Sequence, residues 1–330
     1  MSKKRLGIIG CVATAVLAVA LILLLILGKD KSYRVIKVLQ IDGSATVERD
    51  GSEALDVYEG MALENGDTLS VDANSTVVLQ MDGDKYGYVE EDTILNMVAE
   101  GDEGDNKTII ELERGAITCH VENALSENSS YEVHTPNSVM AVRGTSFRVE
   151  YILGMQMSFR FNPADLPVSL QNELADSVAD GYTRTSVFEG TVATTLLNPD
   201  GTTGKTSMLI AGREAWIGGD ATSSYFLEES TSIRRNLLPL QSLNALLQIS
   251  DNGGDLLMED NEITQLQHDI NVKETHMMYF YVGDTLFGTQ EVDHGTLPEE
   301  PSLRPAENGA WNINFRASVL DDTYVYWVEE

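Results

Sequence analysis

Cysteine is almost absent from this chain. There are two cysteines among 330 residues, Cys11 inside an apolar run and Cys119 far downstream. A pair placed in this way gives no disulfide framework. The sequence therefore argues against a small secreted module that is held together by disulfides.

Positive charge is also scarce. The chain has 22 Lys and Arg against 52 Asp and Glu, which gives a formal net charge of −30. Phosphate backbones and anionic lipid head groups would repel such a surface, so we expect no nucleic-acid partner. Cationic partners and divalent ions are electrostatically permitted, although acidity of this kind commonly serves only to keep a domain soluble.

The motifs of common catalytic sites are lacking as well. No G-x-S-x-G elbow occurs, and the stretch Gly201–Thr206 is not a phosphate loop because Pro199 stands where the first glycine is required. The five histidines show neither H-x-H nor H-E-x-x-H spacing. We therefore expect no catalytic residue, no metal, no cofactor and no enzymatic activity. An envelope carbohydrate-active enzyme is the third-ranked alternative, because paired carboxylates could meet in a cleft by chance.

One long apolar run is present near the start of the sequence. Residues 6–27 carry no charge, and 22 residues at 1.5 Å rise make about 33 Å of helix, enough to cross a bilayer core. No A-x-A cleavage pattern ends the run, so we expect an anchor rather than a signal peptide. The sequence predicts a transmembrane helix over 6–28 after a cytoplasmic tail of 1–5. Basic residues flank the run on both sides, so charge alone does not fix its orientation.

Short β-branched segments bounded by turn residues follow this run. They recur about every 8–12 residues from Val35–Ile41 to Glu214–Ile217. This spacing is typical of sandwich-like or stacked antiparallel strands, and the absence of a strand–helix–strand rhythm disfavours a parallel α/β sheet. The stretch of about 155–185 breaks the rhythm and is interpreted as an insertion.

The last third of the chain has a different pattern. Residues 220–271 are expected to be a helical linker, because Pro239 stands where a helix could begin and Gly253–Gly254 could end it. A strand-like pattern returns over 272–330, which predicts a small C-terminal β domain.

An ordered set of glycine motifs lies within the first β region. Gly60–Leu69 fits G-x-x-L-x-x-G-D-x-L. We expect the glycines to supply positive φ at the turns of successive short hairpins and Asp67 to bond its own turn, which are roles in the fold rather than in catalysis. The motif residues are Gly60, Leu63, Gly66, Asp67, Gly115, Thr135, Pro136, Gly144, Thr145, Phe147, Gly190 and Gly212.

In this order the motifs resemble the FecR domain, and the resemblance covers about 35–219. It implies a domain outside the cytoplasm that senses the state of a transporter, joined to a cytoplasmic segment that controls an extracytoplasmic-function sigma factor. Only residues 1–5 precede the apolar run, so we expect no sigma-factor partner here. From the resemblance we retain only the expectation that the domain lies outside the cytoplasm.

A second resemblance covers about 275–328. Tyr279–Asp284 and Val319–Trp327, with Trp311 between them, look like the small β-grasp-like repeat of internalin-type bacterial surface proteins. That resemblance implies a stalk or an adhesive module.

An acidic loop over 100–106 is a weak calcium candidate. Asp102, Glu103 and Asp105 supply oxygen ligands, but the loop lacks the ligand order of an EF-hand.

These observations combine into one prediction. The fold class is mainly β: an N-terminal transmembrane helix, a FecR-like domain over 35–219, a short helical linker and a small β-grasp-like domain. We expect a single-pass protein of the bacterial cell membrane with its main domains outside the cytoplasm. Its predicted function is a non-enzymatic binding or structural module for an envelope protein or polymer. The alternative is a sensor or regulatory subunit that signals through a membrane partner.

Overall fold

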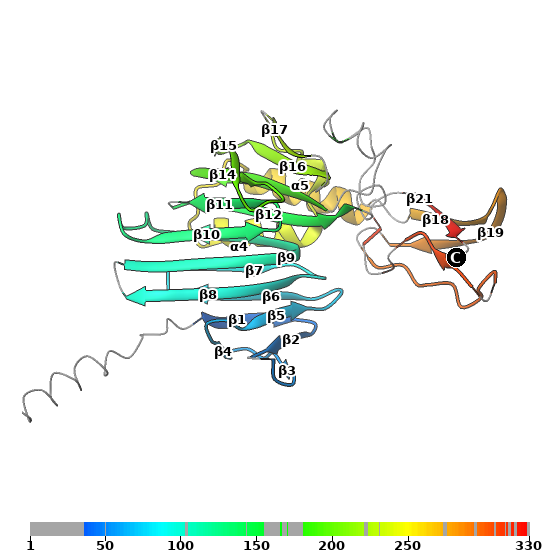
Figure 1. The fold of residues 1–330 in the computed structure, drawn as a ribbon, viewed down its shortest axis with the longest axis horizontal. Helices are drawn as coiled ribbons and strands as arrows, with labels where there is room; N and C mark the ends of the chain where they lie inside the picture. The colour runs from blue at the N-terminus through cyan, green and yellow to red at the C-terminus, as the bar shows by residue number, and fades with distance from the viewer. Residues whose placement is uncertain are drawn as a thin grey trace, which may run out of the picture.

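The computed structural model describes most of the chain from residue 36 onward. The described residues are 36–49, 51–102, 105–142, 144–154, 166, 170, 181–220, 224–230, 232–272, 276–293, 296–306, 308–313, 315, 318–319 and 322–328. They form an N-terminal β domain, two helices that lie against it, and a C-terminal β unit at its side (Figure 1).

Two sheets make up the N-terminal β domain. Sheet A has the order β4-β1-β6-β7-β9-β12-β13-β16-β17. Its strands are β1 (Ile36–Asp42), β4 (Ala62–Leu63), β6 (Thr76–Met81), β7 (Lys85–Val89), β9 (Asp105–Val121), β12 (Ser146–Leu153), β13 (Gly181–Glu189), β16 (Glu214–Asp220) and β17 (Ser224–Ser230).

Sheet B has the order β3-β2-β5-β8-β9-β10-β11-β14-β15. Neighbouring strands are antiparallel in both sheets, except for the parallel pair of β9 and β10. Its other strands are β2 (Ala45–Glu48), β3 (Leu55–Asp56), β5 (Thr68–Val71), β8 (Ile94–Asp102), β10 (Ser130–Thr135), β11 (Ser138–Val142), β14 (Thr191–Leu197) and β15 (Thr203–Ile210).

The long strand β9 belongs to both sheets. Its first half pairs with β8 in sheet B as far as Arg114, and its second half pairs with β12 in sheet A from Gly115 onward. Gly115 has φ of 88° at this crossing, a conformation that glycine adopts without strain. A Cβ atom there would lie 2.5 Å from the Cα of Thr93. Only glycine therefore fits the point where β9 changes sheet.

The other motif glycines occupy similar places. They lie where the chain passes from one sheet to the other, with φ between 69° and 89°, rather than at the hairpin turns expected from the sequence. These positions are Gly60 (β3 to β4), Gly66 (β4 to β5), Gly144 (β11 to β12), Gly190 (β13 to β14) and Gly212 (β15 to β16).

The main hydrophobic core fills the space between the two sheets. Alternate residues of each strand point inward, as the period-two pattern predicts. Leu79, Cys119 and Phe147 are fully buried there. The opposite face of sheet B is partly exposed: along β14, for example, residues of intermediate exposure alternate with buried ones.

The outer face of sheet A is covered as well. Helix α4 (Leu240–Asp251) begins directly after Pro239, and α5 (Asp260–Val272) follows it. Phe188 of β13 packs against Leu243 and Leu246 of α4. Sheet A is thus buried on both faces along β12 and β13, and a charged residue on the covered part of its outer face requires a partner.

Glu214 of β16 is one such residue, and it fastens the segment before α4 to the sheet. Arg184 donates to Glu214 from Nε at 3.1 Å and from Nη2 at 2.9 Å. Trp216 Nε1 and Arg234 Nη1 donate to its other oxygen at 3.1 and 2.5 Å. Arg184 also donates to two carbonyl oxygens of the 3-10 helix η2 (Arg235–Leu237): that of Arg234, just before the helix, and that of Leu237, its last residue.

The C-terminal β unit is a four-stranded sheet of order β19-β18-β21-β20. Trp311, Phe280 and Trp327 pack on its inner face. The described residues thus place a sheet in the region that resembles the internalin-type repeat, and that resemblance stays a prediction. The strands are β18 (His276–Val282), β19 (Thr285–Val292), β20 (Ala310–Trp311) and β21 (Thr323–Val328).

The predicted fold class needs one correction. Within the described residues no helix has both the length and the apolar character that a membrane crossing requires. The predicted transmembrane helix over 6–28 is therefore not supported, and residues 1–35 lie outside the described residues. The remaining fold is mainly β.

Two further expectations differ from the structure. Of the predicted insertion over 155–185, residues 181–185 belong to β13, and most of the rest lies outside the described residues. Residues 224–230, expected in the helical linker, form β17. This strand pairs with β16 and extends sheet A by one strand, which the polar composition of the segment did not indicate.

Replacement of Gly115 tests the crossing in β9. We expect Gly115→Ala to lower the free energy of unfolding more than Gly60→Ala, measured by urea denaturation. Both residues have positive φ, which costs an alanine about 1–3 kcal/mol. Only Gly115 adds a clash with Thr93, worth about 1–3 kcal/mol more, whereas nothing lies within 4 Å of a Cβ at Gly60. Equal losses would contradict this account of the crossing.

Acidification tests the Glu214 cluster. Burial disfavours the charged carboxylate, but the charge of Arg184 and the hydrogen bonds from Trp216, Arg234 and Arg184 outweigh burial and hold the pKa of Glu214 below its ordinary value of 4.5. A lowered pKa stabilises the fold at neutral pH, and this contribution is lost as pH falls through the folded pKa. The free energy of unfolding, measured by urea denaturation, should differ most between wild type and Glu214→Gln near pH 7, and this difference should shrink below pH 4.5. A difference that did not change with pH would contradict a stabilising role for the charge of Glu214.

Candidate functional site

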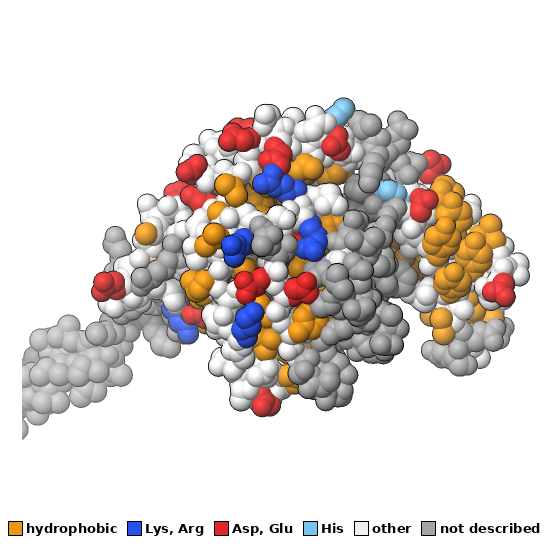
Figure 2. All heavy atoms as spheres, turned by 90° about the horizontal axis from the view of Figure 1, so that it is seen from above, with side chains coloured by type: hydrophobic (Ala, Val, Ile, Leu, Met, Phe, Trp, Pro, Cys, Tyr) orange, Lys and Arg blue, Asp and Glu red, His pale blue; other side chains and the backbone are white. Residues whose placement is uncertain are grey.

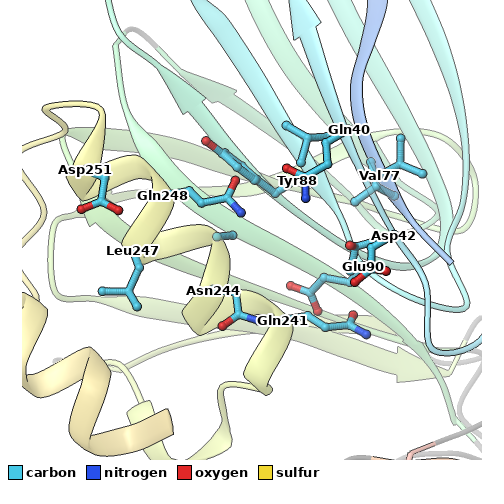
Figure 3. A pocket seen from close by; sticks show the side chains of 14 residues that line it. Gln40, Asp42, Val77, Tyr88, Glu90, Gln241, Asn244, Leu247, Gln248 and Asp251 are labelled. Atoms are coloured by element: carbon cyan, nitrogen blue, oxygen red, sulfur yellow. The ribbon is translucent and has the colours of Figure 1, made fainter. Parts of the chain in front are cut away.

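A groove of about 320 Å³ opens between sheet A and helix α4. Figure 3 shows Gln40, Asp42, Val77, Tyr88 and Glu90 on the sheet side. The helix faces them with Gln241, Asn244, Leu247, Gln248 and Asp251. The groove exists because α4 rests on the outer face of the sheet through small and aliphatic contacts, such as Ala245 against Tyr88.

The polar side chains that line the groove are mostly amides and carboxylates. Four side-chain amides and three carboxylates line the groove, and the described lining residues include no Lys or Arg. Burial raises the pKa of Tyr88 to about 12, so its phenol is neutral and can donate a hydrogen bond. This set suits a ligand that offers hydrogen-bond donors or positive charge, and it disfavours an anionic one.

A buried ion-pair cluster continues from the groove beneath α4. Arg148 of β12 donates to both oxygens of Glu90, from Nε at 2.8 Å and from Nη2 at 2.7 Å. Its third donor, Nη1, reaches Glu150 at 2.7 Å. Arg148, Glu90 and Glu150 are 1%, 4% and 1% exposed. Such two-pronged pairs are the strong form of the Arg–carboxylate contact.

Glu90 and its neighbour Glu91 join the three parts of the molecule. The Ser242 hydroxyl at the start of α4 donates to Glu90 at 2.5 Å, and the amide of Glu91 donates to Gln241 at 3.0 Å. Ser318 of the C-terminal β unit donates to the Glu91 carboxylate at 2.7 Å. We name Glu90–Glu91 the acidic corner. Sheet A, α4 and the C-terminal β unit all meet there.

Comparison with known proteins identifies the first β domain. Residues 60–158 match the family described as FecR protein. This part of the chain is a FecR domain. The match runs from β4 to β12, whereas the two sheets extend from residue 36 to residue 230. A FecR domain fits a regulatory or signalling role.

Other comparisons add little. No curated protein matches the chain. Two crystal structures of a candidate anti-sigma factor from Parabacteroides distasonis ATCC 8503 are similar at 12% and 13% identity, each with a TM-score of 0.37. Each match covers 80% of this chain, and 99% and 98% of the other chain. A TM-score this low supports no conclusion about the present chain.

The remaining motif residues of the FecR domain also have places in its fold. Leu63 and Phe147 lie in the main core. Asp67, with 0% exposure, accepts hydrogen bonds from the amide of Glu64 in its own turn and from Arg49. The others lie away from the groove: Thr135 bonds Thr183, Pro136 is in the turn between β10 and β11, and Thr145 donates to the carbonyl of Thr191.

The calcium candidates are only partly described. Asp102 ends β8 and Asp105 begins β9, and the two are paired in register across the hairpin. Glu103 lies outside the described residues. A group of three or more His, Cys, Asp or Glu that could hold a metal is not found among the described residues. Calcium binding at this loop stays a prediction.

Cys119 and His120 point to opposite faces of β9, as expected from their adjacency. Cys119 lies in the core, where burial raises the pKa of its thiol to about 12 and keeps it protonated. His120 contacts Ser146 at 2.8 Å on the outer face, and burial lowers the pKa of its imidazole. Both side chains are packed in the fold.

Sequence reasoning missed the groove and its buried cluster. Arg148 and Glu150 alternate with apolar residues in β12, which is the usual pattern of a strand with one exposed face. Nothing in that pattern shows that α4, almost 100 residues later, covers the charges. The amides of Gln241, Asn244 and Gln248 recur at helical spacing, which is a usable signal only once the partner surface of the helix is known.

Removal of Arg148 tests the buried cluster. We expect Arg148→Met to destabilise the protein by about 3–5 kcal/mol, because it leaves Glu90 and Glu150 buried beside an apolar side chain. The matched control is Lys205→Met, which breaks an exposed pair with Glu229 and should cost less than about 1 kcal/mol. Urea denaturation of both variants measures the difference. Similar values for the two would contradict a stabilising role for the cluster.

Proposed function

We propose that this chain is a non-enzymatic regulatory module that binds a protein partner outside the cytoplasm, through the groove between sheet A and α4. The FecR domain supports the regulatory part of the proposal. The observation that carries the binding part is the groove itself, with its seven amide and carboxylate side chains.

The lining favours a protein segment as the ligand. Side-chain amides can pair with peptide N–H and C=O groups, and carboxylates can receive Lys or Arg. Gln241 already accepts from a backbone amide, that of Glu91, at 3.0 Å. An envelope polymer rich in hydroxyl groups is the second candidate ligand, because hydroxyls can bond to the same amides and carboxylates.

The acidic corner suggests how binding would be transmitted. Glu90 lines the groove and also holds Arg148 and Ser242. Its neighbour Glu91 holds the C-terminal β unit through Ser318. A ligand that bonded to Glu90 would compete with these contacts, and so would act on α4 and the C-terminal β unit together. This makes a sensor more consistent with the arrangement than a passive binder.

Site-specific photo-crosslinking tests the groove. A photoreactive residue at Asn244, which lines the groove and is exposed, should cross-link a protein partner in intact cells. The same residue at Met208, 60% exposed on sheet B, should not. Protease treatment of the adduct distinguishes a protein from a polymer. Absence of an adduct at Asn244, or equal adducts at both positions, would refute binding in the groove.

A fusion of alkaline phosphatase to the C-terminus serves as the control for location. This reporter is active only outside the cytoplasm, so the proposal requires activity in intact cells. A cytoplasmic fluorescent fusion that matured while the phosphatase fusion stayed inactive would overturn the extracytoplasmic part. The result at Asn244 would still decide whether the groove binds.

A further inference from the structure

Four tyrosines share the outer face of the C-terminal sheet. Tyr279 and Tyr281 alternate along β18 with buried Met278 and Phe280. Tyr324 and Tyr326 alternate along β21 with buried residues and are 54% and 44% exposed. The parallel register pairs Tyr279 with Tyr324 and Tyr281 with Tyr326. We call this set the tyrosine face.

The four rings form one continuous stack. Tyr279 and Tyr324 have centroids 5.0 Å apart and an interplanar angle of 15°. Tyr324 and Tyr281 are 6.4 Å apart, and Tyr281 and Tyr326 are 5.5 Å apart. The rings therefore hold one another in place before any partner arrives. Rigid aromatic side chains give contact area at a low cost in conformational entropy.

Apolar side chains extend the tyrosine face. Leu286 is paired with Tyr281 and is 49% exposed, and Val328, two residues after Tyr326, is 55% exposed. Figure 2 shows a contiguous hydrophobic surface over this part of the molecule, with acidic side chains near its margins. Scattered single apolar residues are normal on a protein surface, but a gathered patch marks an interaction site.

The charge of the C-terminal region around this patch is mainly negative. Residues 276–330 hold ten Asp and Glu, two Arg and no Lys, a net charge of −8. Glu291, paired with Met277, and Asp322, which precedes β21, lie at one end of the tyrosine face. Asp284 lies at the other end, in the turn between β18 and β19. Both ends therefore attract positive charge.

The charges discriminate among possible occupants. An anionic membrane or polymer would be repelled by the carboxylates at the ends. A second copy of the chain would bring two acidic surfaces together, each from a chain with net charge −30. A segment with Lys or Arg is complementary, because its cations can lie against tyrosine rings or donate to phenol oxygens while the carboxylates balance their charge.

We propose that the tyrosine face is a docking surface for a protein segment rich in lysine or arginine. The tyrosines form two rows that run across the strands, Tyr279 with Tyr324 and Tyr281 with Tyr326. The rows are about 7 Å apart, the spacing of alternate residues along a strand. An extended basic segment with a cation at every second position matches these rows. This site is separate from the groove, so each of the two can fail without the other.

Titration with short peptides tests the tyrosine face. Binding of labelled hexalysine to the full chain is followed by fluorescence anisotropy, with hexaglutamate and a neutral Ser-Gly hexapeptide as comparison probes. We expect only hexalysine to bind, more weakly at higher salt. Tyr324→Ser with Tyr326→Ser should weaken binding by at least about tenfold. The matched control Leu303→Ser, 74% exposed in the same unit, should leave it unchanged.

Charge variants separate docking from general attraction to an acidic protein. Asp284→Asn with Glu291→Gln should weaken binding, whereas Glu53→Gln with Asp56→Asn, exposed in the N-terminal β domain, should not. If the double serine variant fails to fold by thermal melting, the single exposed substitution Tyr326→Lys gives the same test. Equal hexalysine binding by all variants would overturn the proposal. So would tyrosine-dependent binding to anionic vesicles, or tyrosine-dependent dimerisation in light scattering.

Discussion

The contact between Arg148 and Glu90 ties three strands of sheet A to helix α4. It spans the outer face of β9, since Glu90 follows β7 and Arg148 lies in β12. Ser242 adds the start of α4 to the same carboxylate. A buried charge without a partner costs several kcal/mol. The helix, the groove beside it and the acidic corner therefore depend on this pair remaining intact.

A constraint on the backbone explains why the FecR domain has its sequence signature. The chain moves between two sheets, and these corners need φ values that only glycine adopts without strain. The signature therefore records the corners of the fold and contains little about a ligand. This explains why the motif can identify the domain while the groove lies elsewhere, at Tyr88, Glu90 and residues of α4.

The strands were predictable because their signal is local. The ends of β2 and β6 follow directly from β-branched runs between turn residues, and Pro239 and Gly253–Gly254 bracket α4. The transmembrane assignment rested on one apolar run and is not supported by the described residues. The groove was not predictable, since Glu91, two residues after β7, and Gln241 of α4 are in contact although 150 residues separate them in the sequence. Local periodicity holds no information about such a pairing.

The groove and the tyrosine face, neither of which was predicted from the sequence, have the same kind of charge. The described lining of the groove has carboxylates and amides but no cation, and the tyrosine face has carboxylates at both ends. Each surface attracts positive charge, and a net charge of −30 steers cationic partners toward both. The acidity, interpreted from the sequence mainly as an aid to solubility, then acquires a second role. A basic partner long enough to reach both surfaces would gain from linking the two contacts, because the second becomes intramolecular.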